Sequence, residues 1–218
     1  YSFLSLFNFI TFRVGASILT SLFFSLIFGQ FIINKLSLVQ PEGQPIRKDG
    51  PETHIIQKAG TPTMGGVLII LSVLISSILW SDLHNNFLWI GLISLLIFGI
   101  IGFLDDFKKI KSNSSSGLKG TTRIVLQLFF ALIISLVILY ILDDKIDTSI
   151  AFPFFKNLII NFGYFYLVIS LFIIVGSANA VNLTDGLDGL AIVPVMIVAM
   201  TFAFIAYVTG NIIFSDLS

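Results

Sequence analysis

The chain contains no cysteine and very little charge. Of its 218 residues, 12 are Lys or Arg, 12 are Asp or Glu, and two are His. The absence of cysteine excludes disulfide bonds, thiolate metal sites and cysteine nucleophiles within these residues. Charged residues make up 11%, against about 25% in soluble domains, and the mean hydropathy is +1.01; together these exclude a water-soluble globular protein. The net charge of zero gives no general attraction to nucleic acid.

What the chain does have is apolar sequence, in six windows of 19 to 28 residues without Asp, Glu, Lys or Arg. A transmembrane helix needs about 20 apolar residues, whereas a membrane strand needs about 10 that alternate. The windows therefore predict an all-α polytopic membrane bundle of about six helices, a single transmembrane domain over residues 1–218. Residues 1–12 are too short to span and are predicted to lie at the interface. The predicted spans are 14–34, 64–81, 87–104, 123–142, 160–178 and 190–209.

The basic residues predict the orientation of these spans. Loops 35–63, 105–123 and 179–189 fall on one side of the membrane, with nine Lys and Arg residues against three on the other side. Cytoplasmic loops carry the excess of basic residues, so these three loops are predicted to be cytoplasmic. The nine are Lys35, Arg47, Lys48, Lys58, Lys108, Lys109, Lys111, Lys119 and Arg123, and the three are Arg13, Lys145 and Lys156.

The first cytoplasmic loop ends in a segment suited to phosphate binding. Lys58 offers a point charge, and Thr61 and Thr63 offer hydroxyl donors, close to several glycines that allow the backbone to approach a ligand. The alternative is a solvated turn in which Lys58 only anchors the next span at the interface.

The second cytoplasmic loop begins with two adjacent carboxylates, Asp105 and Asp106. Such a pair at a membrane edge is costly unless it is paired or binds a cation. One Asp could hold a metal or activate an acceptor, while Lys108 or Lys109 holds the other. The alternative is an ordinary helix C-terminus, but acidic residues there oppose the helix dipole.

The third cytoplasmic loop contains Asn179, Asn182, Asp185 and Asp188, each three residues from the next. If the segment is helical, such residues share a face. An ordinary Asx-turn connection is the alternative, since Gly186 follows Asp185 directly.

Together the three loops suit Mg²⁺-assisted chemistry on a phosphate, with the phosphate of a lipid as one substrate. Carboxylates without cysteine, and with only His54 and His84 as imidazoles, favour Mg²⁺ over zinc. The aspartate-rich stretch 143–147 lies on the opposite side and is predicted to be a solvated loop.

These segments resemble a known family. Residues 47–54, 58–66, 102–107 and 179–190 are similar, in this order, to the phospho-N-acetylmuramoyl-pentapeptide transferases. These belong to the polyprenyl-phosphate N-acetylhexosamine-1-phosphate transferases of the bacterial inner membrane. The resemblance implies that phospho-MurNAc-pentapeptide passes from UDP to undecaprenyl phosphate, with Mg²⁺, giving lipid I and UMP for peptidoglycan synthesis, cell-wall biogenesis, cell shape and cell division.

The resemblance also implies roles for individual residues. Asp105 would deprotonate or position the lipid phosphate, and Asp106 would support it electrostatically. Lys58 and Thr63 would bind the nucleotide sugar. The uridine and diphosphate pocket would be lined by Asn182, Asp185, Gly186 and Asp188, with Asp185 as a catalytic residue near Mg²⁺. Direct attack and a covalent aspartyl intermediate both remain open.

The chain departs from this family in length. Family members have about ten spans, and their later loops carry another metal-binding Asp and a His-rich segment. We therefore expect the isolated 218 residues to lack a C-terminal part and to be inactive. Two other functions stay open: an N-acetylglucosamine-1-phosphate transferase of the sister branch, and a non-catalytic lipid-phosphate carrier. The sequence leaves the oligomeric state open, with a homodimer as one alternative.

Overall fold

The structure is a computed structural model that describes residues 3–41, 43, 60–112, 117–142, 148–151, 155, 158–185 and 190–215. The chain forms two compact units, Tyr1–Ile146 and Asp147–Ser218. That all 218 residues form one membrane domain stays a prediction.

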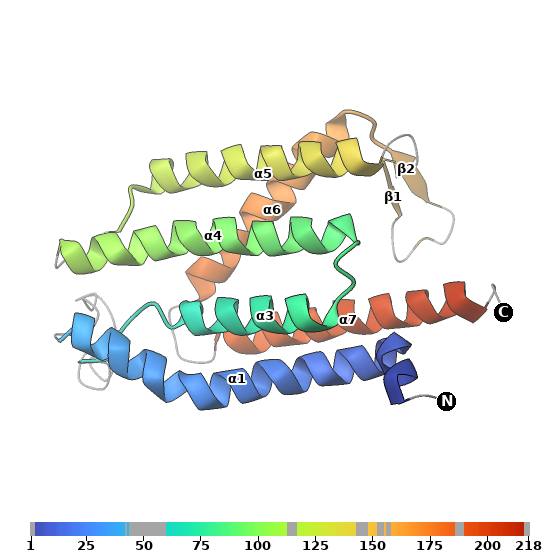
Figure 1. The fold of residues 1–218 in the computed structure, drawn as a ribbon. Coiled ribbons are helices and arrows are strands. Elements are labelled where there is room, and N and C mark those ends of the chain that lie inside the picture. Colours follow the sequence, from blue (N-terminus) through green and yellow to red (C-terminus); the bar gives the residue numbers. More distant parts are fainter. Residues whose placement is uncertain are drawn as a thin grey trace. The chain divides into compact units, whose positions relative to one another are not determined.

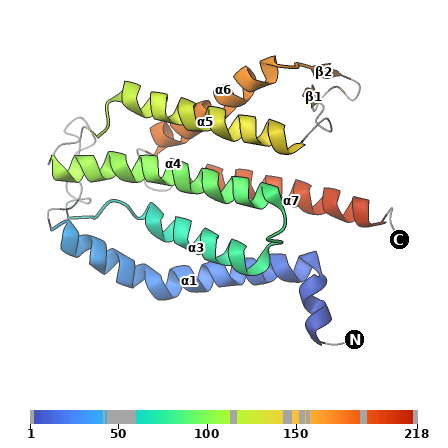
Figure 2. The ribbon, with the colours of Figure 1, turned by 45° about the horizontal axis from the view of Figure 1, so that its top comes forward.

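The first unit is a row of antiparallel helices. α1 packs on α3, α3 on α4 and α4 on α5, and both views show them side by side (Figures 1 and 2). Each helix lies against its neighbour in sequence, as is usual for consecutive elements, and the connections from α3 to α4 and from α4 to α5 are short. The elements are η1 (Phe3–Asn8), α1 (Ile10–Val39), α3 (Gly66–Trp80), α4 (Asn86–Lys111) and α5 (Gly120–Leu142).

The surface of these helices is apolar, and several of their buried positions are small or polar, beside the buried apolar residues Leu92, Ile101 and Ile134. Ser72 and Ser76 of α3 and Ala131 and Ser135 of α5 are buried, whereas many Leu, Ile and Phe side chains are exposed. Ser72 satisfies its hydroxyl within its own helix by donating to the carbonyl oxygen of Ile69 at 2.9 Å. Small residues between helices and large apolar residues outside are the pattern of helices that pack within lipid.

Four helices of the described chain are long and apolar enough to cross a membrane: α1, α4, α5 and α6. Two shorter apolar helices accompany them, α3 with 15 residues and the stretch Ile192–Val208 of α7. The protein is therefore an all-α, multi-pass membrane bundle, as the sequence predicted. α3, with its 15 residues, falls below the usual spanning length of about 20 residues.

α4 begins at a defined cap and extends beyond its predicted end. The Asn85 side chain accepts a hydrogen bond from the backbone N–H of Phe87 at 2.9 Å, which caps the first turn. The last turn carries Lys108, Lys109 and Lys111, whose charges favour a helix C-terminus. The predicted span ended at residue 104, but a helix need not stop where the apolar sequence stops, because its backbone bonds persist in water.

The same effect shortens all three predicted cytoplasmic loops. α1 continues to Val39, into the predicted loop 35–63. α4 ends at Lys111 and α5 begins at Gly120, so both helices extend into the predicted loop 105–123. Asn179 and Asn182, predicted in a loop, lie on α6.

An aromatic cluster lies at the other end of α3. The rings of Phe7 and Trp80 stack with centroids 5.9 Å apart, and Phe12 meets Trp80 edge-on at 6.1 Å. The indole N–H of Trp80 donates to the Thr20 hydroxyl at 2.8 Å. Aromatic residues of this kind are typical of a membrane interface, and the interfacial position of residues 1–12 stays a prediction.

The turn between α3 and α4 is exposed and polar. The backbone N–H of His84 donates to the Asp82 carboxylate at 3.0 Å, and this bond holds the pKa of Asp82 below its usual range. Both side chains face solvent. The contact closes a turn and forms no site.

The second unit contains a short hairpin followed by two helices. Strands β1 (Ser149–Ala151) and β2 (Ile159–Asn161) pair antiparallel, with Ile150 opposite Ile160. The helices are α6 (Phe165–Thr184) and α7 (Ile192–Ser215). The predicted span 160–178 was therefore wrong at its start: its first residues belong to β2. An uncharged run that includes the β-branched pair Ile159-Ile160 fits a strand as well as a helix.

Candidate active site

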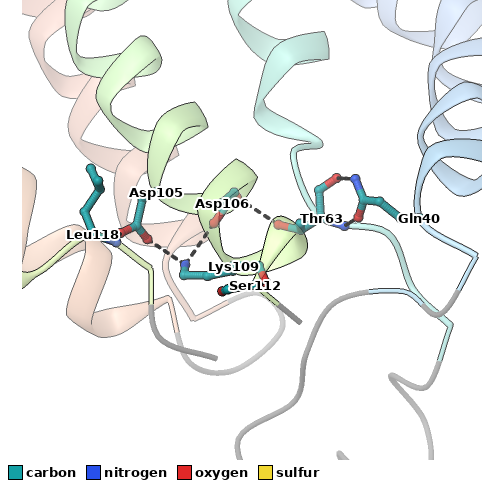
Figure 3. Close-up of polar contacts among 7 residues, drawn as sticks. All are labelled: Gln40, Thr63, Asp105, Asp106, Lys109, Ser112 and Leu118. Atoms are coloured by element: carbon teal, nitrogen blue, oxygen red, sulfur yellow. Dashed lines mark hydrogen bonds and ion pairs between the residues drawn. The ribbon is translucent and has the colours of Figure 1, made fainter. Parts of the chain in front are cut away.

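Four segments of the first unit meet at one end of the helix row. They are the end of α1, the segment before α3, the last turns of α4, and the segment before α5 (Figure 3). Each contributes one or more polar groups to a continuous chain of hydrogen bonds. These polar groups belong to Gln40, Thr63, Asp105, Asp106, Lys109 and Leu118.

Lys109 holds the two carboxylates together. Its ammonium lies 2.7 Å from Oδ2 of Asp105 and 2.9 Å from Oδ1 of Asp106. The spacings are i,i+4 and i,i+3 along α4, so one long side chain reaches both neighbours on the helix surface. One positive charge among two negative charges leaves the cluster with a formal charge of about −1.

The remaining carboxylate oxygens also accept hydrogen bonds. Oδ1 of Asp105 accepts from the backbone N–H of Leu118 at 2.8 Å, and Oδ2 of Asp106 accepts from the Thr63 hydroxyl at 2.8 Å. Asp105 is only 7% exposed. All four oxygens therefore have a donor, which fixes the direction of both carboxylates before any ligand arrives.

Gln40 fixes the backbone of Thr63. Its side-chain Oε1 accepts from the Thr63 N–H at 2.9 Å, and its Nε2 donates to the Thr63 carbonyl oxygen at 3.3 Å. Gln40 is 3% exposed and directly follows α1. The next residue, Met64, has a φ of +74° and is buried. A side chain in this left-handed conformation costs of order 1 kcal/mol, so the surrounding contacts must impose it.

The structure resolves one alternative that the sequence left open. Lys109, not Lys108, pairs with the carboxylates, and it pairs with both. The predicted residues Asp105, Asp106 and Thr63 lie together. The spacing of Asp105, Asp106 and Lys109 on a helix is a readable signal for this pairing, whereas the contributions of Gln40 and of the Leu118 backbone follow from loop conformation and have no such signal.

The predicted residues of the third loop lie in the second unit. Asn182 is exposed on the last turn of α6, and Asp185 is the exposed residue that follows the helix, its N–H donating to the Val181 carbonyl at 3.1 Å. The Asn179 side chain donates a hydrogen bond within its own helix, to the Val175 carbonyl oxygen at 2.8 Å. The meeting of this loop with the first two therefore stays a prediction. Lys58, Gly186 and Asp188 lie outside the described residues.

The donors present suit a hard cation. Carboxylate oxygens are the ligands that Mg²⁺ prefers, and such oxygens are present on Asp105 and Asp106 in the first unit and, separately, on Asp185 in the second. Within the described ranges, no three His, Cys, Asp or Glu residues lie close enough to hold one ion together. The chemistry of the donors fits magnesium, while a complete ligand set is absent from the part of the chain that the structure describes.

Comparison with known proteins identifies the family. The family model described as glycosyl transferase family 4 matches residues 88–218, more than half of the chain. The chain belongs to glycosyl transferase family 4. Residues 58–70 also match the first signature of phospho-N-acetylmuramoyl-pentapeptide-transferase. The family-4 match contains Asp105, Asp106 and Lys109, and the signature contains Thr63.

Three curated relatives of this chain are named phospho-N-acetylmuramoyl-pentapeptide-transferase. The chain is 50% identical to the protein of Rickettsia felis over 212 residues, which are 97% of the chain and 58% of that protein. It is 51% identical to that of Rickettsia akari over 211 residues, with the same coverage. It is 50% identical to that of Pelagibacter ubique over 216 residues, 99% of the chain and 60% of that protein. The chain thus spans less than two thirds of these relatives.

Proposed function

We propose that the protein carrying this chain is a phospho-N-acetylmuramoyl-pentapeptide transferase of peptidoglycan synthesis. It would transfer phospho-MurNAc-pentapeptide from UDP-MurNAc-pentapeptide to undecaprenyl phosphate, forming lipid I and UMP. One observation carries the proposal: the segment that matches the signature brings Thr63 into a hydrogen bond with Asp106, in the region that matches the family model. The names of the relatives at about 50% identity support the same activity.

The proposed reaction is a displacement at phosphorus. A phosphate oxygen of undecaprenyl phosphate bonds to the sugar-linked phosphorus of the donor, the bond from that phosphorus to the bridging oxygen breaks, and UMP leaves with the electron pair. Asp105 would accept the acceptor's proton or position its phosphate, and Asp106 would support Asp105 electrostatically. This is the direct attack. A covalent aspartyl intermediate would divide it into two displacements: a carboxylate oxygen would first bond to that phosphorus as UMP leaves, and the lipid phosphate oxygen would then displace the carboxylate, with the same overall balance.

The polar contacts suit Asp105 to this role. Its carboxylate is nearly buried, paired with Lys109 and aimed by the Leu118 N–H. Donors fixed in advance cost no reorganisation when charge moves during a reaction. Lys109 also lowers the negative charge that an anionic phosphate meets on its approach.

The donor and the cation would be held by residues from several loops. Lys58 and Thr63 would bind the nucleotide sugar, and Asn182, Gly186 and Asp188 would line its uridine and diphosphate pocket. Asp185 would hold Mg²⁺, which, when bound, would neutralise charge on the diphosphate.

We further propose that the protein lies in the bacterial inner membrane with this site on the cytoplasmic face. The excess of basic residues on the loops next to the site supports this orientation. UDP-linked sugars are cytoplasmic, so the donor would reach the site from that side, and the lipid acceptor would reach it from the bilayer.

The test is UMP release by the full-length protein in liposomes. We expect release from UDP-MurNAc-pentapeptide only when undecaprenyl phosphate and Mg²⁺ are both present, and loss of release after chelation by EDTA. Turnover of UDP-N-acetylglucosamine in its place would assign the protein to the sister branch. Binding of undecaprenyl phosphate without UMP release from either donor would instead indicate a lipid-phosphate carrier.

A further inference from the structure

Gly117 lies against the Asp105 carboxylate. A Cβ atom added to Gly117 would lie 2.6 Å from Cγ and 2.7 Å from Oδ2 of Asp105. Real Cβ atoms essentially never approach other atoms within 3.0 Å, so any other residue at this position would displace its surroundings. By contrast, a Cβ on Gly120, three residues later, would meet nothing within 4 Å.

The reason for glycine at this position is space rather than backbone conformation. The positive-φ residues of the described chain are Gly43, Gly60, Met64 and Gly163, and Gly117 is not among them. The φ angle of Gly117 therefore does not by itself require glycine. The methyl group of an alanine at this position would, however, displace the Asp105 carboxylate.

The close approach of the backbone gives Asp105 one of its two donors. Because residue 117 lacks a side chain, the following N–H, that of Leu118, comes to 2.8 Å from Oδ1 of Asp105. The other oxygen is paired with Lys109 at 2.7 Å. A methyl group at residue 117 would push the carboxylate away from the backbone and change the geometry of both contacts.

We propose that Gly117 is a positioning residue for the reaction: it lets the backbone of the α4–α5 connection clamp Asp105 in its reactive orientation. This inference rests on the proposed function, because it assigns Gly117 a role through Asp105. A misplacement of about 1 Å can reduce a rate about 100-fold. For the full-length protein carrying Gly117→Ala we expect turnover to fall at least about tenfold, with the KM for UDP-MurNAc-pentapeptide within about twofold of the parent.

The matched control is Gly120→Ala, which adds the same methyl group in open space. We expect it to keep parental turnover. Calorimetric titration with the nucleotide donor counts the folded binding sites in each variant. Gly117→Ala should keep the parental stoichiometry, so that its loss of turnover belongs to the chemical step. Parental turnover in Gly117→Ala, or a loss of turnover matched by an equal loss of binding sites, would overturn the proposal.

A second measurement does not depend on activity. The Leu118 N–H is protected by Asp105, so hydrogen exchange in the segment after α4 should speed up in Asp105→Ala and in Gly117→Ala, and not in Gly120→Ala. Unchanged hydrogen exchange in Gly117→Ala would overturn the proposed clamp on Asp105, whatever reaction the protein performs. Faster exchange in this variant, combined with no UMP release by the parent protein, would reject only the proposed function.

A double variant covers the case in which Gly117→Ala does not fold. Asp105→Ala removes the carboxylate that the new methyl group would strike. The double variant Gly117→Ala/Asp105→Ala should therefore melt at a higher temperature than Gly117→Ala alone. An equal or lower melting temperature would show that residue 117 is sensitive for another reason, and would reject the role through Asp105.

Discussion

Among the individual residues of the site, the main feature is the relief of charge repulsion between two carboxylates. Asp105 and Asp106 are adjacent, and two carboxylates at a membrane edge repel each other and any phosphate that approaches. Lys109 relieves part of this repulsion by contacting both carboxylates. The Thr63 hydroxyl and the Leu118 N–H donate hydrogen bonds to the remaining two oxygens. The acidic pair could be predicted from the sequence, which left its partner open between Lys108 and Lys109, but the donors from other segments could not.

Asp105→Asn tests the central carboxylate. The amide keeps the volume but loses the negative charge, and one of its two polar atoms becomes a donor that faces Lys109 or the Leu118 N–H. We expect UMP release to fall by at least about 100-fold, while the protein still inserts into membranes. Asp82→Asn, in the exposed turn at the other end of α4, is the matched control and should stay near the parent. Near-normal turnover of Asp105→Asn would remove Asp105 from the reaction.

Lys109→Ala tests the shared ammonium. Without it, two adjacent carboxylates remain with no positive partner from their own helix, so we expect turnover to fall by about 10- to 100-fold. Lys108→Ala removes the same charge one residue earlier, from a side chain that does not pair with either Asp, and should change turnover less than about threefold. Equal effects of the two substitutions would mean that only the total charge of the loop matters.

For the helices and strands, the sequence predicted which segments are helical better than it predicted where each helix begins and ends. Six apolar helices follow from six uncharged windows, because only a helix satisfies its backbone over such lengths in lipid. Charge marks where lipid ends, not where a helix ends, so the extension of α4 to Lys111 was missed. The β1–β2 hairpin was missed because β2, with its β-branched Ile159 and Ile160, lies inside the uncharged window that follows Lys156.

Gln40→Ala tests how α1 holds the segment before α3. The substitution leaves the N–H and C=O of Thr63 without their partner, at a cost of about 1–3 kcal/mol. We expect a lower melting temperature in detergent, faster hydrogen exchange in residues 60–65, and weaker binding of the nucleotide donor. Gln30→Ala is the matched control, since exposed Gln30 donates only within α1, to Asn34 at 2.9 Å. A similar change in both variants would argue against a specific role for Gln40.

Across the first unit as a whole, the two ends of the helix row differ in the groups that they present. One end of the helix row carries the hydrogen-bonded carboxylates, and the other carries the aromatic cluster around Trp80. The fold class and the order of the helices followed from hydropathy. The arrangement of the third loop relative to the first two depends on long-range packing, for which Asn182 and Asp185 by themselves give no signal.

The orientation can be tested with single cysteines, because these 218 residues contain none. Any cysteines elsewhere in the full-length protein are first replaced by serine. Ser81 and Ser112 are exposed and flank α4 at its two ends. With an impermeant maleimide on intact spheroplasts, we expect Ser81→Cys to be labelled and Ser112→Cys to be labelled only after lysis. The reverse pattern would invert the topology and place the site on the wrong side for a cytoplasmic donor.

The length of α4 has a consequence for where a lipid would meet this site. Asp105 follows Asn86 by 19 residues, which correspond to about 29 Å along a helix, close to the hydrocarbon thickness of about 30 Å. The carboxylates would then sit at the depth of the lipid phosphates, level with the inner headgroups. A polyprenyl phosphate could present its headgroup there by sideways diffusion alone, with its tail still dissolved in the bilayer and no need to be lifted out of it.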